Sequence, residues 1–276
     1  MKKTILITGA SSGIGRETAR YFAARSWNVA ATMRSPEKET ELKDLPNTGI
    51  YKLDVTDKEN IAETLKKVEV DFGRIDVLLN NAGYSAVGVF EKSTSEEIRK
   101  QFDVNVFGLM DLTREIIPYF RKRGTGTIIN LSSIGGRATF PLYSPYHASK
   151  WAVEGFAESL QFELRPFNIK VKNIEPGPIK TDFYDRSQNV FENDNITGYE
   201  DFEQNMLDYM QKAGKTAPGP EIVAETIYKA ATDGKFKLRY PAGKQAKMAL
   251  GLRSILPSAW FNGIVRRMSD KISKKS

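Results

Sequence analysis

Short runs of β-branched residues alternate with amphipathic segments along this chain, and this alternation constrains the fold more than any other feature. The first run, KTILITGA, enters a glycine-rich turn, and the next segment, GIGRETARYFAARS, places Ile14, Ala19 and Phe22 at helical spacing. Further strand-like runs are NVAATMRS, GIYKLDVTD, RIDVLLNNAG, GTIINLSS, NIKVKNIEPG and FKLRYP. Strands that alternate with helices in this way predict a parallel sheet covered by helices on both faces.

Helical segments are expected between these strands, and two of them begin with capping signals. Asp57 or a neighbour opens a helix that runs through Phe72, and STSEE precedes a long helix over 95–123. Two more helices are expected over 146–165 and 220–233. An α/β chain of 276 residues with this pattern is most simply interpreted as one domain.

Two segments depart from the alternation. Residues 182–218 are polar and dotted with aromatic residues, which is typical of a substrate loop or lid, and part of this segment is expected to be helical. Residues 245–276 are rich in basic and apolar side chains and extend past the alternating pattern. We therefore expect a main domain over residues 1–244 and a basic C-terminal extension over residues 245–276.

Composition excludes several kinds of chemistry. The chain has no cysteine, so disulfides, thiolate metal sites and thiol nucleophiles are excluded, and its one histidine, His147, cannot build a metal site. The net charge is +7 at pH 7, but the basic residues are dispersed except in RKR at 121–123 and in the tail. No nucleic-acid-binding signature is present, so a solvated basic surface is favoured over nucleic-acid binding.

The opening MKKTILITGASSG mimics the start of a secretion signal, but glycines interrupt its apolar run within a few residues. No apolar run reaches the length of about 18 residues that a membrane-spanning helix needs. We therefore expect the opening to be part of the mature structure and the protein to be cytoplasmic, which the lack of cysteine allows.

The glycine-rich turn TGASSGIG lies between the first strand and the first helix, where backbone N–H groups and the helix dipole favour a phosphate group. An ordinary tight turn is the alternative. The letters GASSG also fit the nucleophile elbow of α/β hydrolases, with Ser11 as the nucleophile. That function requires a histidine base, and His147 is far from the C-terminal region where such folds place one. It would also leave Tyr146 and Lys150 unexplained, so a phosphate-binding turn is preferred.

Two Tyr-x-x-x-Lys pairs occur, Tyr146 with Lys150 and Tyr240 with Lys244, and spacing alone does not distinguish them. Pro241 would break the helix that the second pair needs in order to share a face. Tyr146 and Lys150 stand one helical turn apart at the start of a predicted helix, so their side chains share a face. We therefore expect chemistry at the first pair and a packing role for Tyr240.

With its motifs in this order, the sequence resembles the short-chain dehydrogenase/reductase family. The motifs are TGASSGIG, LDVTD, NNAG, FDVNVFG, IINLSS, YHASK and PGPIKT, and the match covers most of residues 4–240. The resemblance implies a single doubly wound, Rossmann-type catalytic domain over residues 1–244, with a parallel sheet of about seven strands. It also implies an oxidoreductase that binds a nicotinamide dinucleotide. NNAGYSAVGVFE and RYPAGKQA look like the members grouped with 17β-hydroxysteroid and retinol dehydrogenases.

The resemblance also assigns the catalytic residues. The family's serine comes thirteen positions before the tyrosine, which gives Ser133, and the second Tyr-x-x-x-Lys pair has no serine at that spacing. Asn105 matches the family residue that places a water behind Lys150 for proton relay, and an ordinary amide in the middle of a helix is the alternative. An asparagine in an apolar helical stretch competes for backbone hydrogen bonds, so a kink is expected there. The neighbouring Ser132 is expected on the opposite face of its strand from Ser133.

These residue types suit hydride transfer to a carbonyl carbon, because that transfer builds negative charge on an oxygen that must then receive a proton near neutral pH. A free phenol, with a pKa of about 10, exchanges protons poorly there. The charge of Lys150 favours the phenolate, so Tyr146 can serve as acid in reduction and as base in oxidation. The resemblance adds that Lys150 holds the nicotinamide ribose and that Ser133 donates a hydrogen bond to the developing oxyanion.

Cofactor choice depends on the end of the second strand. An acidic residue there favours NAD, whereas arginine suits the 2′-phosphate of NADP. Met33 stands in the place of the acid and Arg34 follows, so NADP(H) is expected in preference to NAD(H), unless Arg34 only caps a solvent loop. The cofactor-binding residues that the resemblance implies are Gly9, Ser11, Ser12, Gly13, Ile14, Gly15, Arg34, Ser35, Asp54, Val55, Asn81, Ala82, Gly83, Tyr146, Lys150, Pro176, Gly177, Ile179 and Thr181.

The substrate is the least constrained part of the hypothesis. The residues expected to wall its pocket are Ser85, Val87, Gly135, Tyr143, His147 and Phe183. Aromatic residues in 182–218 suggest a fairly apolar small-molecule alcohol or carbonyl compound, unless they pack on their own domain. Two other functions stay open, a sugar-nucleotide epimerase or dehydratase and a catalytically silent dinucleotide sensor. The first usually carries T-G-x-x-G-x-x-G, and the second would more naturally lack a catalytic residue.

Partners are expected by resemblance and by composition. Family members commonly pair through their fourth and fifth helices, so the resemblance implies a homodimer or homotetramer. The apolar residues of 245–276 predict that this extension packs on the domain. Contact of an amphipathic helix with an anionic membrane surface is the alternative.

Overall fold

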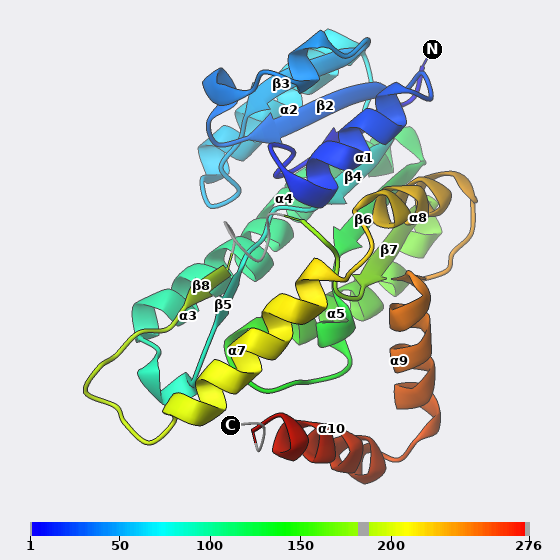
Figure 1. The fold of residues 1–276 in the computed structure, drawn as a ribbon. Helices are drawn as coiled ribbons and strands as arrows, with labels where there is room; N and C mark the ends of the chain where they lie inside the picture. The colour runs from blue at the N-terminus through cyan, green and yellow to red at the C-terminus, as the bar shows by residue number, and fades with distance from the viewer. Residues whose placement is uncertain (1, 182–187, 274–276) are drawn as a thin grey trace.

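A computed structural model describes residues 2–181 and 188–273 of the chain (Figure 1). Seven parallel strands form one sheet in the order β3-β2-β1-β4-β6-β7-β9. The strands are β1 (Thr4–Ile7), β2 (Asn28–Met33), β3 (Thr48–Lys52), β4 (Val77–Asn80), β6 (Gly126–Leu131), β7 (Ile169–Pro176) and β9 (Arg239–Ala242). The prediction of a single doubly wound α/β domain with about seven parallel strands is confirmed.

Helices cover both faces of the sheet, as the alternation predicts (Figure 1). The helices of one face are α1 (Gly13–Ala23) and α8 (Glu221–Thr232), and those of the other are α2 (Lys58–Phe72), α4 (Leu109–Arg123) and α5 (Ser144–Leu164). Successive residues of β1 point to opposite faces of the sheet. Ile5 and Ile7 lie in the core under α1 and α8, and Leu6 lies in the core under α2, α4 and α5. Burial of both faces explains why the strands read as continuous apolar runs.

The two predicted capping signals are confirmed. Asp57 begins α2 by accepting a hydrogen bond of 3.0 Å from the backbone N–H of Asn60. Thr94 and Glu97 form a reciprocal capping box at the start of α3 (Ser95–Phe102). Each cap satisfies backbone N–H groups that a helix leaves without internal partners.

The single long helix expected over 95–123 is wrong, because a π-helical turn over Asp103–Gly108 separates α3 from α4. The wider turn brings Asn105 inward, where it is 2% exposed and bonded to groups outside its own helix. Gly108 then packs so closely that a Cβ at this position would lie 2.7 Å from the carbonyl oxygen of Val55. The break therefore fits the start of α4 against the chain that follows β3.

The segment expected to form a loop or lid contains regular structure in its described part, residues 188–218. β8 (Gln188–Val190) pairs in parallel with β5 (Ser85–Val87) as a separate two-stranded sheet, and α7 (Glu200–Lys215) follows. Phe191, just after β8, is 1% exposed, so this aromatic side chain packs on its own domain. Acidic residues in the first turn of α7 and lysines in its last turn suit the helix dipole.

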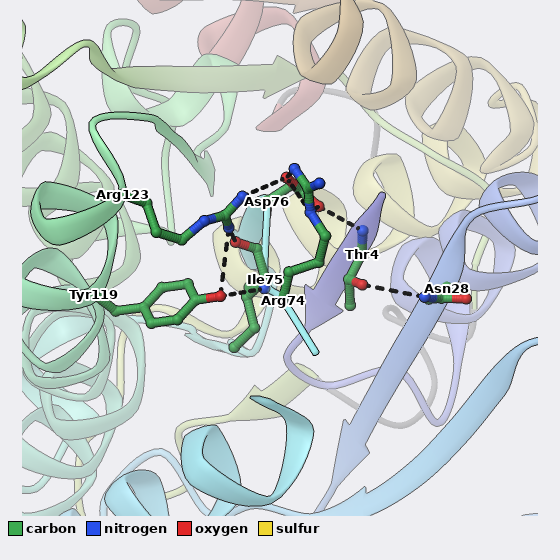
Figure 2. Close-up of polar contacts among 7 residues, drawn as sticks. All are labelled: Thr4, Asn28, Arg74, Ile75, Asp76, Tyr119 and Arg123. Atoms are coloured by element: carbon green, nitrogen blue, oxygen red, sulfur yellow. Dashed lines mark hydrogen bonds and ion pairs between the residues drawn. The ribbon is translucent and has the colours of Figure 1, made fainter. Parts of the chain in front are cut away.

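A polar cluster around Asp76 fixes the amino ends of β1 and β4 (Figure 2). The Asp76 carboxylate accepts a hydrogen bond of 2.9 Å from the backbone N–H of Thr4, and it pairs with Arg74 and Arg123. The hydroxyl of Tyr119, on α4, accepts a hydrogen bond of 2.9 Å from the backbone N–H just before Asp76. These bonds hold the amino ends of β1 and β4 together, at the point where the strand order of the sheet reverses.

Two helices, α9 (Lys244–Ile255) and α10 (Ser258–Ser273), follow β9, and α10 contacts α7 at one end of the molecule (Figure 1). Ala246 and Leu250 of α9 and Phe261 of α10 are buried, so the extension packs on the domain, as expected. In the described parts of the chain, no helix combines the length and the apolar character that crossing a membrane requires.

Candidate active site

A cavity of about 1140 Å³ opens at the carboxyl ends of the strands, where the order of the sheet reverses between β1 and β4. Doubly wound sheets bind ligands at this position. The predicted site residues on its wall are Gly9, Ser11, Ser12, Gly13, Ile14, Gly15, Arg34, Asp54, Val55, Asn81, Ala82, Gly83, Ser133, Gly135, Tyr143, Tyr146, His147, Lys150, Pro176, Gly177, Ile179 and Thr181. The fold therefore brings most of the predicted cofactor and catalytic residues to one site.

The glycine turn after β1 leaves the start of α1 open to the cavity. Gly9 and Gly13 have φ angles of 65° and 51°, which glycine adopts at little steric cost. A Cβ at Gly15 would lie 2.4 Å from the carbonyl oxygen of Gly9, so a larger residue does not fit there. Within the described chain, Ser12 makes no side-chain capping bond to α1, and the first turn of α1 has no acidic residue. The N–H groups and the positive end of the helix dipole are therefore available to a phosphate group.

Arg34 lies at the end of the cavity next to β2. Its side chain is exposed on the cavity wall, whereas Met33 before it is only 3% exposed. Asp54, after β3, accepts hydrogen bonds from the backbone N–H and the hydroxyl of Thr56, at 3.0 and 2.7 Å. Ser35 is half-buried and is not on the cavity wall in the part of the chain that the structure describes. The position where NAD-binding proteins of this fold carry a carboxylate thus holds Met33, and the Arg34 guanidinium group lies directly beside it.

Tyr146 and Lys150 lie one turn apart in α5, and both line the cavity. The Nζ of Lys150 is 5.8 Å from the centre of the Tyr146 ring, and it donates a hydrogen bond of 2.8 Å to the carbonyl oxygen of Leu131. Burial lowers the pKa of Lys150 to about 8, although the charge of Glu154 acts in the opposite direction. The lysine is therefore still mostly charged at neutral pH, and its charge lies close to the phenol.

Ser132 and Ser133 follow β6 and both line the cavity, but they differ in exposure, and their placement on opposite faces stays a prediction. Ser132 is 3% exposed, and its hydroxyl has no hydrogen-bond partner among the described residues. Ser133 is half-buried on the cavity wall, and its Oγ accepts a hydrogen bond of 3.0 Å from the backbone N–H of Gly135. A hydroxyl that accepts this bond keeps its own hydrogen available for a ligand oxygen.

Asn105 lies behind the cavity wall and uses its side chain to join two segments of the site. Its Oδ1 accepts a hydrogen bond of 3.0 Å from the backbone N–H of Tyr84, and its Nδ2 donates to the Tyr84 carbonyl at 2.9 Å. The same nitrogen donates to the Oγ of Ser149, the residue before Lys150, at 3.2 Å. The side chain therefore positions α5 against the chain after β4, and its role in a proton relay stays a prediction.

His147 packs among aromatic side chains on the cavity wall, and its imidazole is uncharged. Its ring stacks on Tyr143 at a centroid distance of 5.3 Å and meets Phe140 edge-on at 6.0 Å. Burial lowers the pKa of His147 to about 4, so the imidazole is neutral at physiological pH. No cluster of potential metal ligands occurs among the described residues.

The other end of the cavity is apolar, and its residues were not predicted from the sequence. Four of them lie on α7 and one on α10, and they are Met206, Tyr209, Met210, Ala213 and Met268. The α7 residues follow the i, i+3, i+4, i+7 spacing of a helix face, so an amphipathic pattern inside 182–218 was the signal that could have identified them.

Two of the predicted substrate residues that the structure describes do not line the cavity. Ser85 and Val87 are fully buried in β5, which pairs with β8, whereas Asn189 of β8 lines the cavity. Phe183 lies outside the described residues. Of the predicted substrate residues, Gly135, Tyr143 and His147 are on the wall, all on the side next to Tyr146.

A buried group of charges lies next to Lys150 and was also not predicted. Glu154 and Glu175 are 3% and 0% exposed, and Arg239 approaches both, at 2.9 Å from Glu154 and 3.9 Å from Glu175. Arg137 lies 3.5 Å from Glu175. Burial, followed by the charge of Glu154, raises the pKa of Glu175 to about 7. Elsewhere, Tyr240 is buried and donates a hydrogen bond of 2.7 Å to Asp233, which confirms its packing role.

Comparison with known proteins establishes the family. A model of the short chain dehydrogenase family matches residues 3–191. The uncharacterized oxidoreductase YusZ of Bacillus subtilis is 43% identical over 278 residues, covering 97% of this chain and 99% of that protein. A 3-ketodihydrosphingosine reductase of Bacteroides thetaiotaomicron is 39% identical over 204 residues, covering 74% of this chain and 72% of that protein. The chain belongs to the short-chain dehydrogenase family and is an oxidoreductase of that family.

Solved structures agree with this assignment. A short-chain dehydrogenase from Streptomyces avermitilis has a TM-score of 0.81 and 32% sequence identity, covering 100% of this chain and 98% of its own. The structure of ElxO with NADP bound has a TM-score of 0.72 and 29% identity, covering 89% of this chain and 100% of its own. The resemblance to the short-chain dehydrogenase/reductase family in the sequence is thus confirmed.

Proposed function

We propose that this protein is an NADP(H)-dependent oxidoreductase that transfers a hydride between nicotinamide and a carbonyl compound or secondary alcohol, with Tyr146 as general acid and base. One observation carries the proposal. Tyr146, Lys150 and Ser133 line the same cavity as the open start of α1 and Arg34. The group that would transfer the proton and the turn that would bind the dinucleotide phosphates therefore line the same cavity.

The start of α1 and Arg34 together suit a dinucleotide that carries a 2′-phosphate. The uncapped N–H groups at the start of α1 suit the pyrophosphate, and close packing of Gly15 against Gly9 and Asn81 holds the turn that presents them. Arg34 is placed to pair with a 2′-phosphate, and the preceding position holds an apolar side chain instead of an acid that would repel one. Binding of NADP by the structural relative ElxO supports the same choice.

The chain's own residues supply the proton. When bound, the nicotinamide supplies or accepts the hydride. In the direction of reduction, Tyr146 donates its phenolic proton to the carbonyl oxygen, and Ser133 donates a hydrogen bond to the same oxygen as negative charge develops. Lys150, still mostly charged at neutral pH, stabilises the phenolate that Tyr146 leaves behind. In the direction of oxidation, the same phenolate removes the proton of the alcohol.

The substrate that suits this cavity is apolar. Met206, Met210 and Met268 line one end of the cavity, and flexible thioether side chains adapt to irregular hydrocarbon surfaces. The neutral ring of His147 and its partner Tyr143 line the end next to Tyr146. The relative named 3-ketodihydrosphingosine reductase supports a keto lipid or another long-chain ketone as the kind of compound accepted.

Steady-state assays with purified protein test the proposal. NADPH and NADH are each offered with short ketones, long-chain ketones, aldehydes, retinoids and steroids, and oxidation of the coenzyme is followed by absorbance. We expect turnover with NADPH, higher kcat/KM than with NADH, and increasing kcat/KM with the length of the ketone chain. Saturable binding of NADPH without turnover on any compound would instead support a catalytically silent sensor, and faster turnover with NADH would contradict the role of Arg34.

A further inference from the structure

The last 33 residues of the sequence carry the net charge of the chain. Residues 244–276 contain eight lysines or arginines and one aspartate, a net charge of +7, which equals the net charge of the whole sequence. Residues 1–243 therefore contain equal numbers of basic and acidic residues. Six of these basic residues and the aspartate lie on α9 and α10, so the two helices carry a net charge of +5.

Helix α10 presents two different apolar faces. One face packs inward through Phe261, which is 5% exposed, and through Met268, which lines the cavity. The other face carries Trp260, 69% exposed, and Ile264, 46% exposed. Arg267 and Lys271 continue the outer face at the same helical spacing and are exposed as well.

Helix α9 repeats this arrangement. Ala246 and Leu250 are buried against the domain, on the side of the helix opposite to its exposed apolar residues. Those exposed residues are Met248, Leu252 and Ile255, at 72%, 41% and 82% exposure. They follow i, i+4, i+7 spacing, so they form one stripe along the helix surface. We call the exposed residues Met248, Leu252, Ile255, Trp260, Ile264, Arg267 and Lys271 the α9–α10 surface.

This surface is unusual within the molecule. Of the fourteen large hydrophobic side chains that are exposed in the described chain, five lie on these two helices. Exposed apolar side chains gathered beside basic ones mark an interaction site more often than single exposed residues do. An outer tryptophan with aliphatic and basic neighbours is the composition of helices that lie in the interface of an anionic membrane.

We propose that the α9–α10 surface docks the protein on the surface of an anionic lipid bilayer. The positive charge of residues 244–276 favours an anionic membrane over a second copy of this chain as the binding partner of this surface. Two copies of this chain meeting through this surface would bring two segments of net charge +7 together, whereas anionic lipid headgroups attract each nearby Lys or Arg by about 1 kcal/mol. The apolar stripe then enters the region between headgroups and acyl chains. A nucleic acid has no such apolar region, so it does not explain the exposed apolar side chains.

Docking through α10 would also place one wall of the cavity next to the bilayer, because α10 contributes to that wall. Met268 of α10 lines its apolar end, and the hydroxyl of Tyr209 on α7 contacts the sulfur of Met268 at 3.9 Å. The helix that would touch the bilayer is therefore also part of the wall that would touch an apolar substrate. The docking inference itself stands on the exposed surface and is tested without turnover.

Flotation with vesicles tests the proposal on the full chain. Vesicles of phosphatidylcholine alone are compared with vesicles in which about one third of the lipid is phosphatidylserine, at low and high salt. We expect binding to the anionic vesicles at low salt and at least about tenfold weaker binding to the neutral ones. Equal binding to both kinds of vesicle, or binding to neither, would overturn the proposal.

Variants at exposed positions locate the contact. Ile255→Glu combined with Trp260→Glu should weaken binding at least about tenfold, because both side chains lose apolar burial. Val70→Glu is the matched control, since Val70 is 74% exposed on α2, and it should leave binding unchanged. Unchanged binding of the double variant would overturn the assignment of the surface. A change from dimer to monomer in that variant, measured by light scattering without lipid, would also overturn it, because the surface would then bind a second copy.

Tryptophan fluorescence gives an independent readout. Trp260 is 69% exposed, so insertion into the bilayer interface should shift its emission to shorter wavelength. The reference protein and the variant at position 260 both carry Trp151→Phe, because Trp151 is 45% exposed and lines a pocket with Asn262 and Val265 of α10. In that background Trp260→Phe should keep most of the binding and lose most of the shift, since the remaining Trp27 is only 6% exposed. A full shift in the Trp260→Phe variant would contradict the placement of this residue at the membrane.

Discussion

The Nζ of Lys150 lies 5.8 Å from the centre of the Tyr146 ring while it donates a hydrogen bond of 2.8 Å to the carbonyl oxygen of Leu131. The lysine is thus tied to the end of β6, the strand that leads to Ser133. One hydrogen bond therefore fixes the position of the lysine relative to both the phenol and the serine.

Replacement of Tyr146 by phenylalanine tests the proton transfer. We expect Tyr146→Phe to reduce kcat by at least about 100-fold, the lower range for loss of a general acid, while the affinity for NADPH changes little. Single-turnover kinetics and NADPH fluorescence titration measure the two effects. Turnover close to that of the wild type would show that another group carries the proton.

Replacement of Arg34 by aspartate tests the choice of coenzyme. A charge-assisted hydrogen bond to a phosphate stabilises a complex by about 1.5–3 kcal/mol, so Arg34→Asp should reduce kcat/KM for NADPH by about tenfold or more. NADH should be affected much less, because it lacks the phosphate. Lys66→Asp, an exposed change on α2, is the control for charge alone. An unchanged ratio of kcat/KM for the two coenzymes would exclude the phosphate contact.

Gly15 tests the glycine turn. A Cβ there would lie 2.4 Å from the Gly9 carbonyl oxygen and 2.6 Å from the Nδ2 of Asn81, so Gly15→Ala must displace the turn. We expect a loss of about 1–3 kcal/mol in unfolding free energy and at least about tenfold weaker NADPH binding. Gly251→Ala, where nothing lies within 4 Å of the added Cβ, should be neutral or slightly stabilising. Equal behaviour of the two variants would refute the packing argument.

Glu175 predicts a pH dependence of stability. Burial raises its pKa from 4.5 in the unfolded chain to about 7 in the folded one, so the folded state holds this proton more tightly and stability falls as pH rises from about 4.5 to about 7. Glu175→Gln removes that fall. Relative to the wild type, the variant should gain up to about 3 kcal/mol in unfolding free energy between pH 5 and pH 8.

Urea unfolding at pH 5 and pH 8 measures this gain. Glu158→Gln is the control, because Glu158 bonds the same Arg239 but its side chain is 55% exposed. Its effect on stability should be small and should not change with pH over this range. The same difference between Glu175→Gln and the wild type at both pH values would argue against a raised pKa.

The order of elements in the sheet could be predicted from the sequence because each strand is short, apolar and bounded by turn residues. The positions of Asp57 and Thr94 at helix starts were equally accessible, since capping depends on neighbouring residues. At Asn105 only a kink could be expected, from an asparagine in an apolar helical stretch. The π-helical form of the break could not, because it is stabilised by hydrogen bonds to Tyr84 and Ser149, which are distant in sequence.

In the site, too, features set by neighbouring residues could be predicted and features set by distant contacts could not. Residues in motifs, such as Gly15 and Tyr146, were located because each motif is local. The wall residues on α7 and α10 were missed, because their place at the cavity depends on how late helices pack over the sheet. The buried pair Glu154 and Glu175 was missed for a similar reason, since one lies on α5 and the other on β7.

The cavity is built from opposite ends of the sequence. Its polar end comes from the turns after β1, β2 and β3, and its apolar end comes from α7 and α10, beyond residue 199. If the coenzyme binds at the polar end and the substrate at the apolar end, as proposed, substitutions in the late helices can change the compound accepted and leave the coenzyme unchanged. Homologues with nearly identical amino-terminal halves need not share a metabolic role, and comparison of their last third would be the better guide to what each one converts.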